Sequence, residues 1–266
     1  MKEKNKGILV VSFGTTHKDT REKTLDAIES AIREEFTDYA VYRAYTSNVV
    51  MRRIEKQEKL YILNVEETIL QMLEDGIEEI IIQPTHVIKG IEYEKIIREA
   101  SKYKDKFKSF AICYLLLGSD LDCEQVSDII IKETEEAGEA DTSKHVFVFM
   151  GHGSEHSANE SYTVLQNEIN KRGYSNILIG TVEGEPEIQD IIDILEDYSY
   201  DTVTLIPLMI VAGDHATNDM SGDDEDSWKS IFTREGYEVE CVLRGMGEYP
   251  GIRRIILDHL RATITG

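Results

Sequence analysis

Residues 8–17, ILVVSFGTTH, and residues 146–156, VFVFMGHGSEH, decide the fold, because each is an apolar strand that runs into a glycine-containing loop. The two segments align when Gly14 is set on Gly153. Their near-continuous apolar runs are typical of parallel strands that are covered on both faces, and the later run Ile80–Ile82 has the same character. The sequence therefore predicts two similar halves, each built on a buried parallel sheet.

The repeat continues downstream and brings polar residues to corresponding places. Setting Gly14 on Gly153 also pairs Phe13 with His152 and His17 with His156. Setting Pro84 on Pro207 pairs Gly90 with Gly213 and Glu92 with His215. Ligands of doubly wound sheets bind at the carboxyl ends of the strands, where these residues lie. Imidazole and carboxylate groups that converge there suit a divalent metal ion or proton transfer. We expect the two halves to face each other across one central cleft, with both histidines and Glu92 turned into it.

Strands and helices alternate along the whole chain, which predicts an α/β fold of two doubly wound parallel-sheet halves. The expected strands are 7–13, 39–45, 78–84, 107–117, 145–150, 176–182, 201–210 and 237–243. The polar segment 138–144 predicts the boundary, which gives an N-terminal half, 1–140, and a C-terminal half, 141–266. The first half is longer, and the extra length predicts an additional helix within 47–63.

The bulk composition excludes several functional classes. The chain has 266 residues, a formal net charge of −22 and 41% hydrophobic residues. This acidity, without any basic stripe, disfavours a nucleic-acid partner. No apolar run approaches the length of a membrane helix, so we expect no membrane partner. Three cysteines without a paired framework and no signal peptide at the start of the chain predict a cytoplasmic protein.

Four residues are candidates for chemistry from their positions alone. His152 and His215 each follow a buried strand, and Glu183 ends a third strand as a candidate third ligand. Glu92 has an alternative explanation, because a carboxylate near a helix N-terminus also stabilises the helix dipole. Metal-binding imidazoles must be unprotonated, so activity should fall at acid pH. There is no phosphate-binding loop, and the glycine pattern after residue 151 fails as a dinucleotide fingerprint, so we expect neither ATP nor another nucleotide.

Several segments resemble the anaerobic (class II) sirohydrochlorin cobaltochelatases of cobalamin biosynthesis. The segments that carry the resemblance are VVSFGT (10–15), RAYTS (43–47), HGS (152–154), GTVEG (180–184), PLMIVAGDHATNDM (207–220) and DSW (226–228). The resemblance spans almost the whole chain. It implies two α/β halves around a tetrapyrrole cleft, and an enzyme that inserts Co²⁺ into sirohydrochlorin or precorrin-2 without ATP.

The same resemblance implies roles for individual residues. His152 would be a metal ligand and the acceptor of a pyrrole proton, while Glu183 and His215 would be metal ligands. Glu92 matches a cleft glutamate of the family and is a second catalytic candidate. The candidates for binding the tetrapyrrole lie in the matching segments and the neighbouring loop: Phe13, Gly14, Thr15, Tyr45 and Lys89.

Three points stay open from the sequence alone. The metal could also be Fe²⁺ or Ni²⁺, as in a ferrochelatase or nickel chelatase, and a non-enzymatic carrier of tetrapyrrole or metal is a further alternative. The polycarboxylate substrate and the acidic chain repel each other, so local cations should line the site. Arg43, Arg52, Arg53 and Lys89 are the candidates, although each could instead be solvated or paired with acids. The sequence also leaves a homo-oligomer open.

Overall fold

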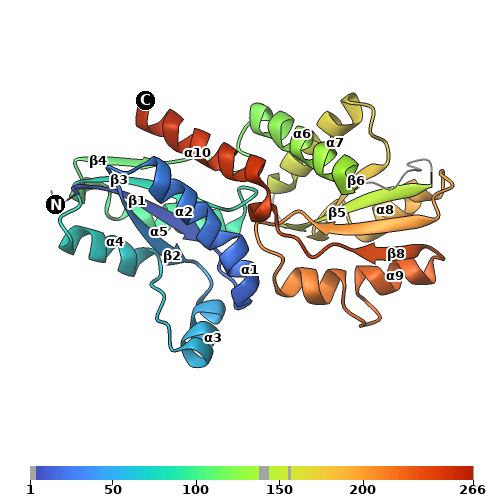
Figure 1. Ribbon diagram of the computed structural model, residues 1–266, viewed down its shortest axis with the longest axis horizontal. Helices are drawn as coiled ribbons and strands as arrows, with labels where there is room; N and C mark the ends of the chain where they lie inside the picture. Colours follow the sequence, from blue (N-terminus) through green and yellow to red (C-terminus); the bar gives the residue numbers. More distant parts are fainter. Residues whose placement is uncertain (1–3, 138–143, 155–156, 266) are drawn as a thin grey trace. The chain divides into compact units, whose positions relative to one another are not determined.

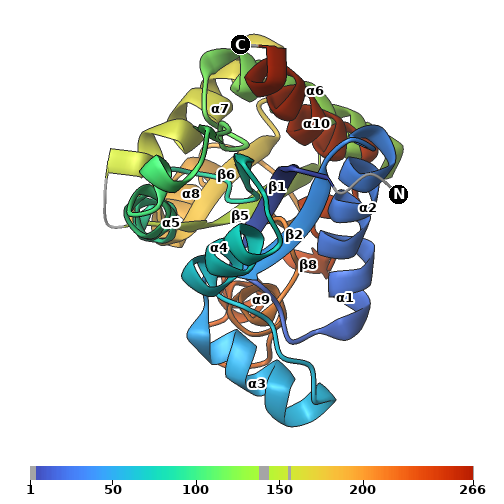
Figure 2. The same ribbon diagram turned by 90° about the vertical axis from the view of Figure 1, so that its left-hand side faces the viewer.

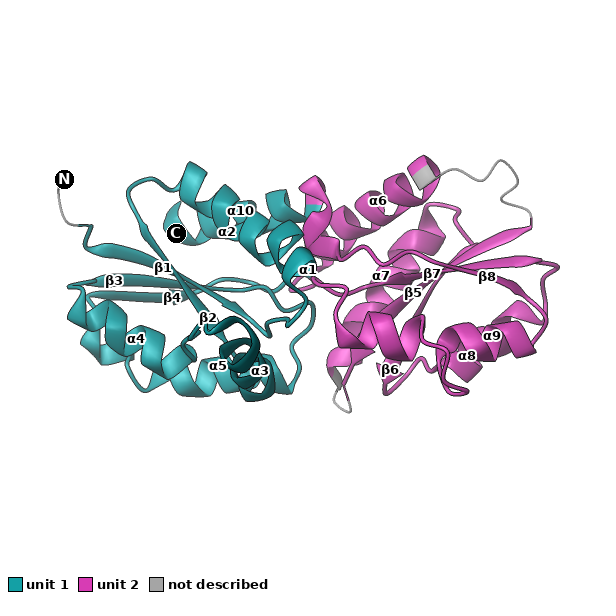
Figure 3. Cartoon of the chain, turned by 60° about the horizontal axis from the view of Figure 1, so that its bottom comes forward, with its two compact units in different colours: residues 1–116, 252–266 teal, residues 117–251 magenta. Residues whose placement is uncertain are grey.

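The computed structural model describes residues 4–137, 144–154 and 157–265. Two compact units divide the chain: residues 1–116 with 252–266, and residues 117–251 (Figure 3). The predicted boundary at 138–144 lies almost wholly outside the described residues, as does His156, the repeat partner of His17. The last helix of the chain groups with the first unit, and the helix that precedes the predicted boundary groups with the second. The central cleft between the halves stays a prediction.

Each unit contains one four-stranded parallel sheet (Figure 1). The first unit has β1 (Lys6–Ser12), β2 (Ala40–Tyr45), β3 (Glu79–Pro84) and β4 (Ser109–Ile112), in the order β2-β1-β3-β4. The second unit has β5 (His145–Gly153), β6 (Ile177–Glu183), β7 (Thr202–Pro207) and β8 (Glu238–Cys241), in the order β6-β5-β7-β8. The predicted α/β fold with two parallel sheets is confirmed.

The register of the two sheets agrees with the sequence repeat. Val11 pairs with Pro84 in the first sheet, and Met150 pairs with Pro207 in the second. Val11 falls on Met150 when Gly14 is set on Gly153, and Pro84 corresponds to Pro207 in the downstream part of the repeat. Both halves therefore keep the same strand order and the same register. Since the carboxyl ends of parallel strands meet at one edge of a sheet, equivalent residues of the repeat reach equivalent places in the two units.

The helices cover both faces of each sheet (Figures 1 and 3). In the first unit they are α1 (Lys18–Lys23), α2 (Leu25–Glu35), α3 (Asn48–Glu58), α4 (Val65–Glu74), α5 (Ile91–Ser101) and α10 (Pro250–Thr265). In the second unit they are α6 (Asp120–Ala137), α7 (Glu160–Lys171), α8 (Ile188–Leu195) and α9 (Trp228–Arg234). Among the helices that the structure describes, none combines the length and apolar character that a membrane crossing requires.

The buried core explains why the strands read as continuous apolar runs. Leu9 and Val11 pack with α4 and α5 on one face, while Ile8 and Val10 are equally buried on the other. The fourth predicted strand, 107–117, is shorter in the structure, because only Ser109–Ile112 pairs with β3 at this edge of the sheet. The predicted extra helix is α3, which stands clear of the sheet layers of its unit (Figures 1 and 2).

Candidate metal and proton-transfer site

His152 lies at the carboxyl end of β5, a central strand of the second sheet. The next residue, Gly153, has a left-handed φ of 81° and lies opposite Glu183 in the register of β5 and β6. A Cβ atom at position 153 would come within 1.9 Å of the Glu183 carbonyl oxygen. Glycine is therefore required at this close approach, which brings the backbone that carries His152 against the end of β6.

His215 comes from the segment after β7 and precedes a single π-helical turn, η3 (Ala216–Met220). Its imidazole meets that of His152 with 4.5 Å between ring centroids and 86° between the ring planes. Both residues are half-buried, so the pair is anchored by the protein and still accessible. The prediction that residues 152 and 215 come together in one place agrees with this geometry.

Hydrogen bonds define which nitrogen of each ring is available. His215 Nδ1 lies 2.5 Å from Asp219 Oδ2, and His152 Nδ1 lies 3.1 Å from the carbonyl oxygen of Gly153. A carboxylate and a carbonyl oxygen can only accept, so both Nδ1 atoms donate. In the neutral form of each ring, Nε2 then carries the lone pair, which can bind a metal ion or take up a proton. A carboxylate behind a metal-binding histidine fixes the tautomer and raises the basicity of the ligand.

Asp219 is a residue that the sequence reasoning missed. Its signal is the spacing His215-x-x-x-Asp219, which places two side chains on one face of a helical turn. The spacing alone is common, and only the contact between the two side chains gives it meaning.

Glu183 ends β6 next to this pair, but its carboxylate is exposed. Within residues 4–137, 144–154 and 157–265, no three His, Cys, Asp or Glu side chains are grouped closely enough to hold a metal ion. The structure thus brings the side chains of His152 and His215 together, whereas the carboxylate of Glu183, the third predicted ligand, is exposed. Glu183 as a metal ligand stays a prediction.

The equivalent edge of the first unit carries aromatic residues. Phe13 follows β1 and is 42% exposed, whereas Tyr45, at the end of β2, is fully buried. Gly14 packs directly on the Tyr45 ring, since a Cβ atom there would lie 2.5 Å from it. Thr15 is buried and accepts a hydrogen bond from the backbone of the same loop, and Lys89 is exposed. Burial raises the pKa of Tyr45 to about 12, so its hydroxyl stays protonated.

Several polar side chains of the first unit have buried atoms without a hydrogen-bond partner among the described residues, and Glu92 and His86 are two of them. Glu92 lies in the first turn of α5, and its Oε2 atom is buried without a hydrogen-bond partner among the described residues. Both ring nitrogens of His86, in the loop after β3, are also buried without a hydrogen-bond partner among the described residues. Burial lowers the pKa of His86 to about 4, so this ring is neutral near pH 7. Buried polar atoms without a partner are rare in folded proteins, so Glu92 and His86 are worth testing for a function.

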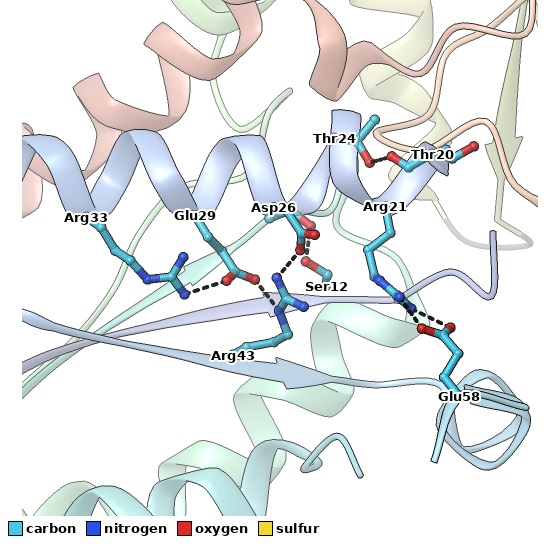
Figure 4. A network of polar contacts seen from close by, with 10 residues as sticks. Ser12, Thr20, Arg21, Thr24, Asp26, Glu29, Arg33, Arg43 and Glu58 are labelled. Atoms are coloured by element: carbon cyan, nitrogen blue, oxygen red, sulfur yellow. Dashed lines mark hydrogen bonds and ion pairs between the residues drawn. The ribbon is translucent and has the colours of Figure 1, made fainter. Parts of the chain in front are cut away.

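The predicted cations differ in availability. Arg43 bonds Glu29 and Asp26 on α2, and Arg33 bonds the other Glu29 oxygen at 2.7 Å (Figure 4). Glu29 is only 1% exposed, so this network is part of the packing of the first unit. Arg43 is therefore committed to acids, as the alternative explanation from the sequence allowed. Arg52 and Arg53 lie exposed on α3.

Comparison with known proteins places the chain in a family. The profile of the cobalt chelatase family CbiK matches residues 6–265. The sirohydrochlorin cobaltochelatase of Salmonella typhimurium is 35% identical over 259 residues, which cover 97% of this chain and 96% of that protein. The sirohydrochlorin cobaltochelatase CbiKC of Nitratidesulfovibrio vulgaris is 32% identical over 262 residues, or 98% of this chain and 91% of that protein.

Solved structures support the fold alone, because their sequence identities are low. SirB from Bacillus subtilis, solved with Fe³⁺, has a TM-score of 0.67 at 15% identity over 97% of this chain and 95% of that one. CbiX, described as the terminal enzyme of siroheme biosynthesis in denitrifying bacteria, has a TM-score of 0.57 at 15% identity over 97% of this chain and 99% of that one. The family profile and the two relatives that align over nearly the whole chain show that the protein is a metal chelatase. The chain belongs to the cobalt chelatase (CbiK) family.

Proposed function

We propose that this protein inserts Co²⁺ into sirohydrochlorin, a step of cobalamin biosynthesis, without ATP. The observation that carries the proposal is the pair His152 and His215, whose rings meet at 4.5 Å with both Nε2 atoms left for chemistry. The names of two relatives that align over nearly the whole chain support sirohydrochlorin as the substrate. Insertion replaces two pyrrole protons by one divalent ion, so the site must supply ligands for the metal and acceptors for the protons.

In this proposal Co²⁺ is a substrate, held first by the protein. Two imidazole nitrogens and the Glu183 carboxylate suit this ion, which accepts both nitrogen and oxygen ligands. Glu183 supports the role by its position, since its backbone lies against Gly153, next to His152. Its exposed carboxylate is free of the desolvation cost that a buried charge would carry before the metal arrives.

Proton acceptance falls to His152, with Glu92 as the candidate for relaying protons in the first unit. The Nε2 atom of His152 is basic in the tautomer that its Nδ1 hydrogen bond defines. The unsatisfied Oε2 atom of Glu92 is an acceptor without a protein donor among the described residues, which supports a role beyond stabilising the dipole of α5. Since the reaction only exchanges ions, holding the metal and accepting protons would suffice without nucleotide hydrolysis.

Binding of the polycarboxylate ring would use the exposed cations of the first unit. Arg52, Arg53 and Lys89 stay as candidates, while Arg43 is replaced in this role because its guanidinium is already bonded to Glu29 and Asp26. Phe13 is exposed and offers an aromatic surface to a tetrapyrrole, whereas Tyr45 would act by packing beneath Gly14. A cytoplasmic location, a homo-oligomer and the lack of nucleic-acid or membrane partners stay predictions from the sequence.

One assay tests the proposal. Purified protein is mixed with sirohydrochlorin and with Co²⁺, Fe²⁺ or Ni²⁺ in turn, and metal insertion is followed by visible absorption. We expect catalysed insertion of Co²⁺ in buffer without ATP. Faster insertion of Fe²⁺ or Ni²⁺ would instead support a different chelatase, and tight binding of the ring without turnover would support a carrier.

A further inference from the structure

The turn at the end of β6, residues 183–186, is held by hydrogen bonds from Asn159 and Thr181. Asn159 Nδ2 donates to the carbonyl oxygens of Glu183 and Glu185, at 3.1 and 2.9 Å. Thr181 donates its hydroxyl to the Gly184 carbonyl at 2.8 Å and its backbone N–H to the Pro186 carbonyl at 2.7 Å. Two residues therefore bind four consecutive carbonyl groups.

The position of Asn159 depends on Gly184. This glycine has a left-handed φ of 76°, and a Cβ atom there would lie 2.7 Å from Asn159 Nδ2 and 2.6 Å from the Ser154 carbonyl oxygen. Because carbonyl oxygens only accept, the amide nitrogen of Asn159 must face them. Both of its N–H groups donate to the turn. Its Oδ1 atom is buried and has no partner within the described parts of the chain.

We infer that Asn159 is a positioning residue that aims the Glu183 carboxylate at the metal substrate. The inference rests on the proposed function, in which Glu183 is the third ligand. The Glu183 side chain is exposed, so the backbone that carries it decides which region the carboxylate can reach. That backbone is held on one side by Gly153, the neighbour of His152, and on the other by Asn159. The groups behind metal ligands typically contribute about 10–100-fold to metal affinity or activity.

The same strand offers a matched control. Gln166, on α7, donates Nε2 to the Ile177 carbonyl at 2.9 Å and accepts the Ile179 N–H through Oε1 at 2.8 Å. Like Asn159, it uses a side-chain amide to bind the backbone of β6, but it does so at the opposite end of the strand from Glu183. Loss of this amide should affect the edge of the sheet and leave the ligand in place.

The experiment measures Co²⁺ binding by calorimetry and by the visible spectrum of bound Co²⁺, without tetrapyrrole. Asn159→Ala should weaken binding about tenfold, at the low end of the range for such groups, while Gln166→Ala should bind as the parent does. Glu183→Gln gives the reference loss, and adding Asn159→Ala to it should cause no further loss. Thr181→Val removes the hydrogen bond from the Thr181 hydroxyl to the turn, and it should also weaken Co²⁺ binding. Thermal unfolding shows whether each variant is folded.

The outcomes separate the inference from the proposed function. Parent-like binding by Asn159→Ala, with weak binding by Glu183→Gln, would overturn the positioning role alone. A further loss when both changes are combined would do the same, since it would mean a general structural effect. Parent-like binding by Glu183→Gln would remove Glu183 as a ligand together with this inference. The insertion assay, run on the parent protein, judges the enzyme function separately.

Discussion

The carboxyl edges of the two sheets have the same backbone arrangement but carry different side chains. Gly14 and Gly153 both adopt a left-handed conformation after equivalent strands, and the pairs of Val11 with Pro84 and Met150 with Pro207 keep one register. The second unit places two imidazoles at its edge, whereas the first places an exposed phenylalanine and a carboxylate at the corresponding positions. The difference shows that a repeated scaffold fixes where side chains arrive, and that single substitutions then decide what each edge can bind.

The largest effect is expected from removing His152, the proposed base of the second unit. His152→Ala should lower the rate of Co²⁺ insertion by about 10²–10⁴-fold, because general-base catalysis contributes on that scale. Phe13→Ala, the change at the equivalent position of the first unit, should affect the KM for sirohydrochlorin more than kcat. Steady-state kinetics measure both, with circular dichroism as the check of folding. Wild-type turnover by His152→Ala would contradict its role.

Asp219 bonds His215 in the second unit, whereas Glu92, at the repeat position of His215, has a buried Oε2 atom without a partner among the described residues. Asp219→Asn should weaken Co²⁺ binding by about 10–100-fold, since an amide holds the imidazole tautomer less strictly than a carboxylate does. His215→Ala serves as the lower limit, and calorimetric titration with Co²⁺ is the measurement. If Asp219→Asn retained the parent affinity, the 2.5 Å contact would have only a structural meaning.

The exposed cations of α3 test whether the first unit binds the substrate carboxylates. Arg52→Gln and Arg53→Gln should each raise the KM for sirohydrochlorin about 2–5-fold, which corresponds to the roughly 0.5–1 kcal/mol of an exposed charge pair. Added salt should reduce the difference from the parent, because it screens surface charges. Lys6→Gln is the control, since Lys6 begins β1 at the other end of the sheet and pairs with Glu79. An unchanged KM in both arginine variants would exclude them from the binding site.

The smallest effect on catalysis is expected from the buried ion network of the first unit. Glu29→Gln removes the charge that Arg43 and Arg33 share, and should lower the free energy of unfolding by about 2–3 kcal/mol, as for a buried hydrogen bond to a charged group. Insertion kinetics should stay within about twofold of the parent if Arg43 has no part in binding. Urea unfolding and the insertion assay measure the two quantities. A large rise in the KM for sirohydrochlorin would instead indicate that Arg43 takes part in substrate binding.

Much of the architecture was predictable because periodicity and burial are local signals. The apolar runs around Val10 and Val148 predict central parallel strands, and the polar residues that follow them predict the functional edge. Boundaries were less predictable where pairing ends by geometry. The helical segment between β1 and β2 is divided into α1 and α2 at Thr24, whose φ and ψ of −114° and −81° interrupt it. β4 is shortened most, because an edge strand ends where its single neighbour stops pairing, and β7 and β8 also end before the predicted 210 and 243.

The sequence by itself determined the repeat, the two parallel sheets, the family and the candidates His152, His215, Glu183 and Glu92, because these depend on spacing and residue type. Tertiary structure alone decided which side chains meet. It joined Asp219 to His215, committed Arg43 to Glu29 and set Asn159 against the Glu183 turn. Contacts of this kind depend on distances of a few ångströms between segments far apart in the chain or on the precise direction of a side chain, which residue spacing does not encode.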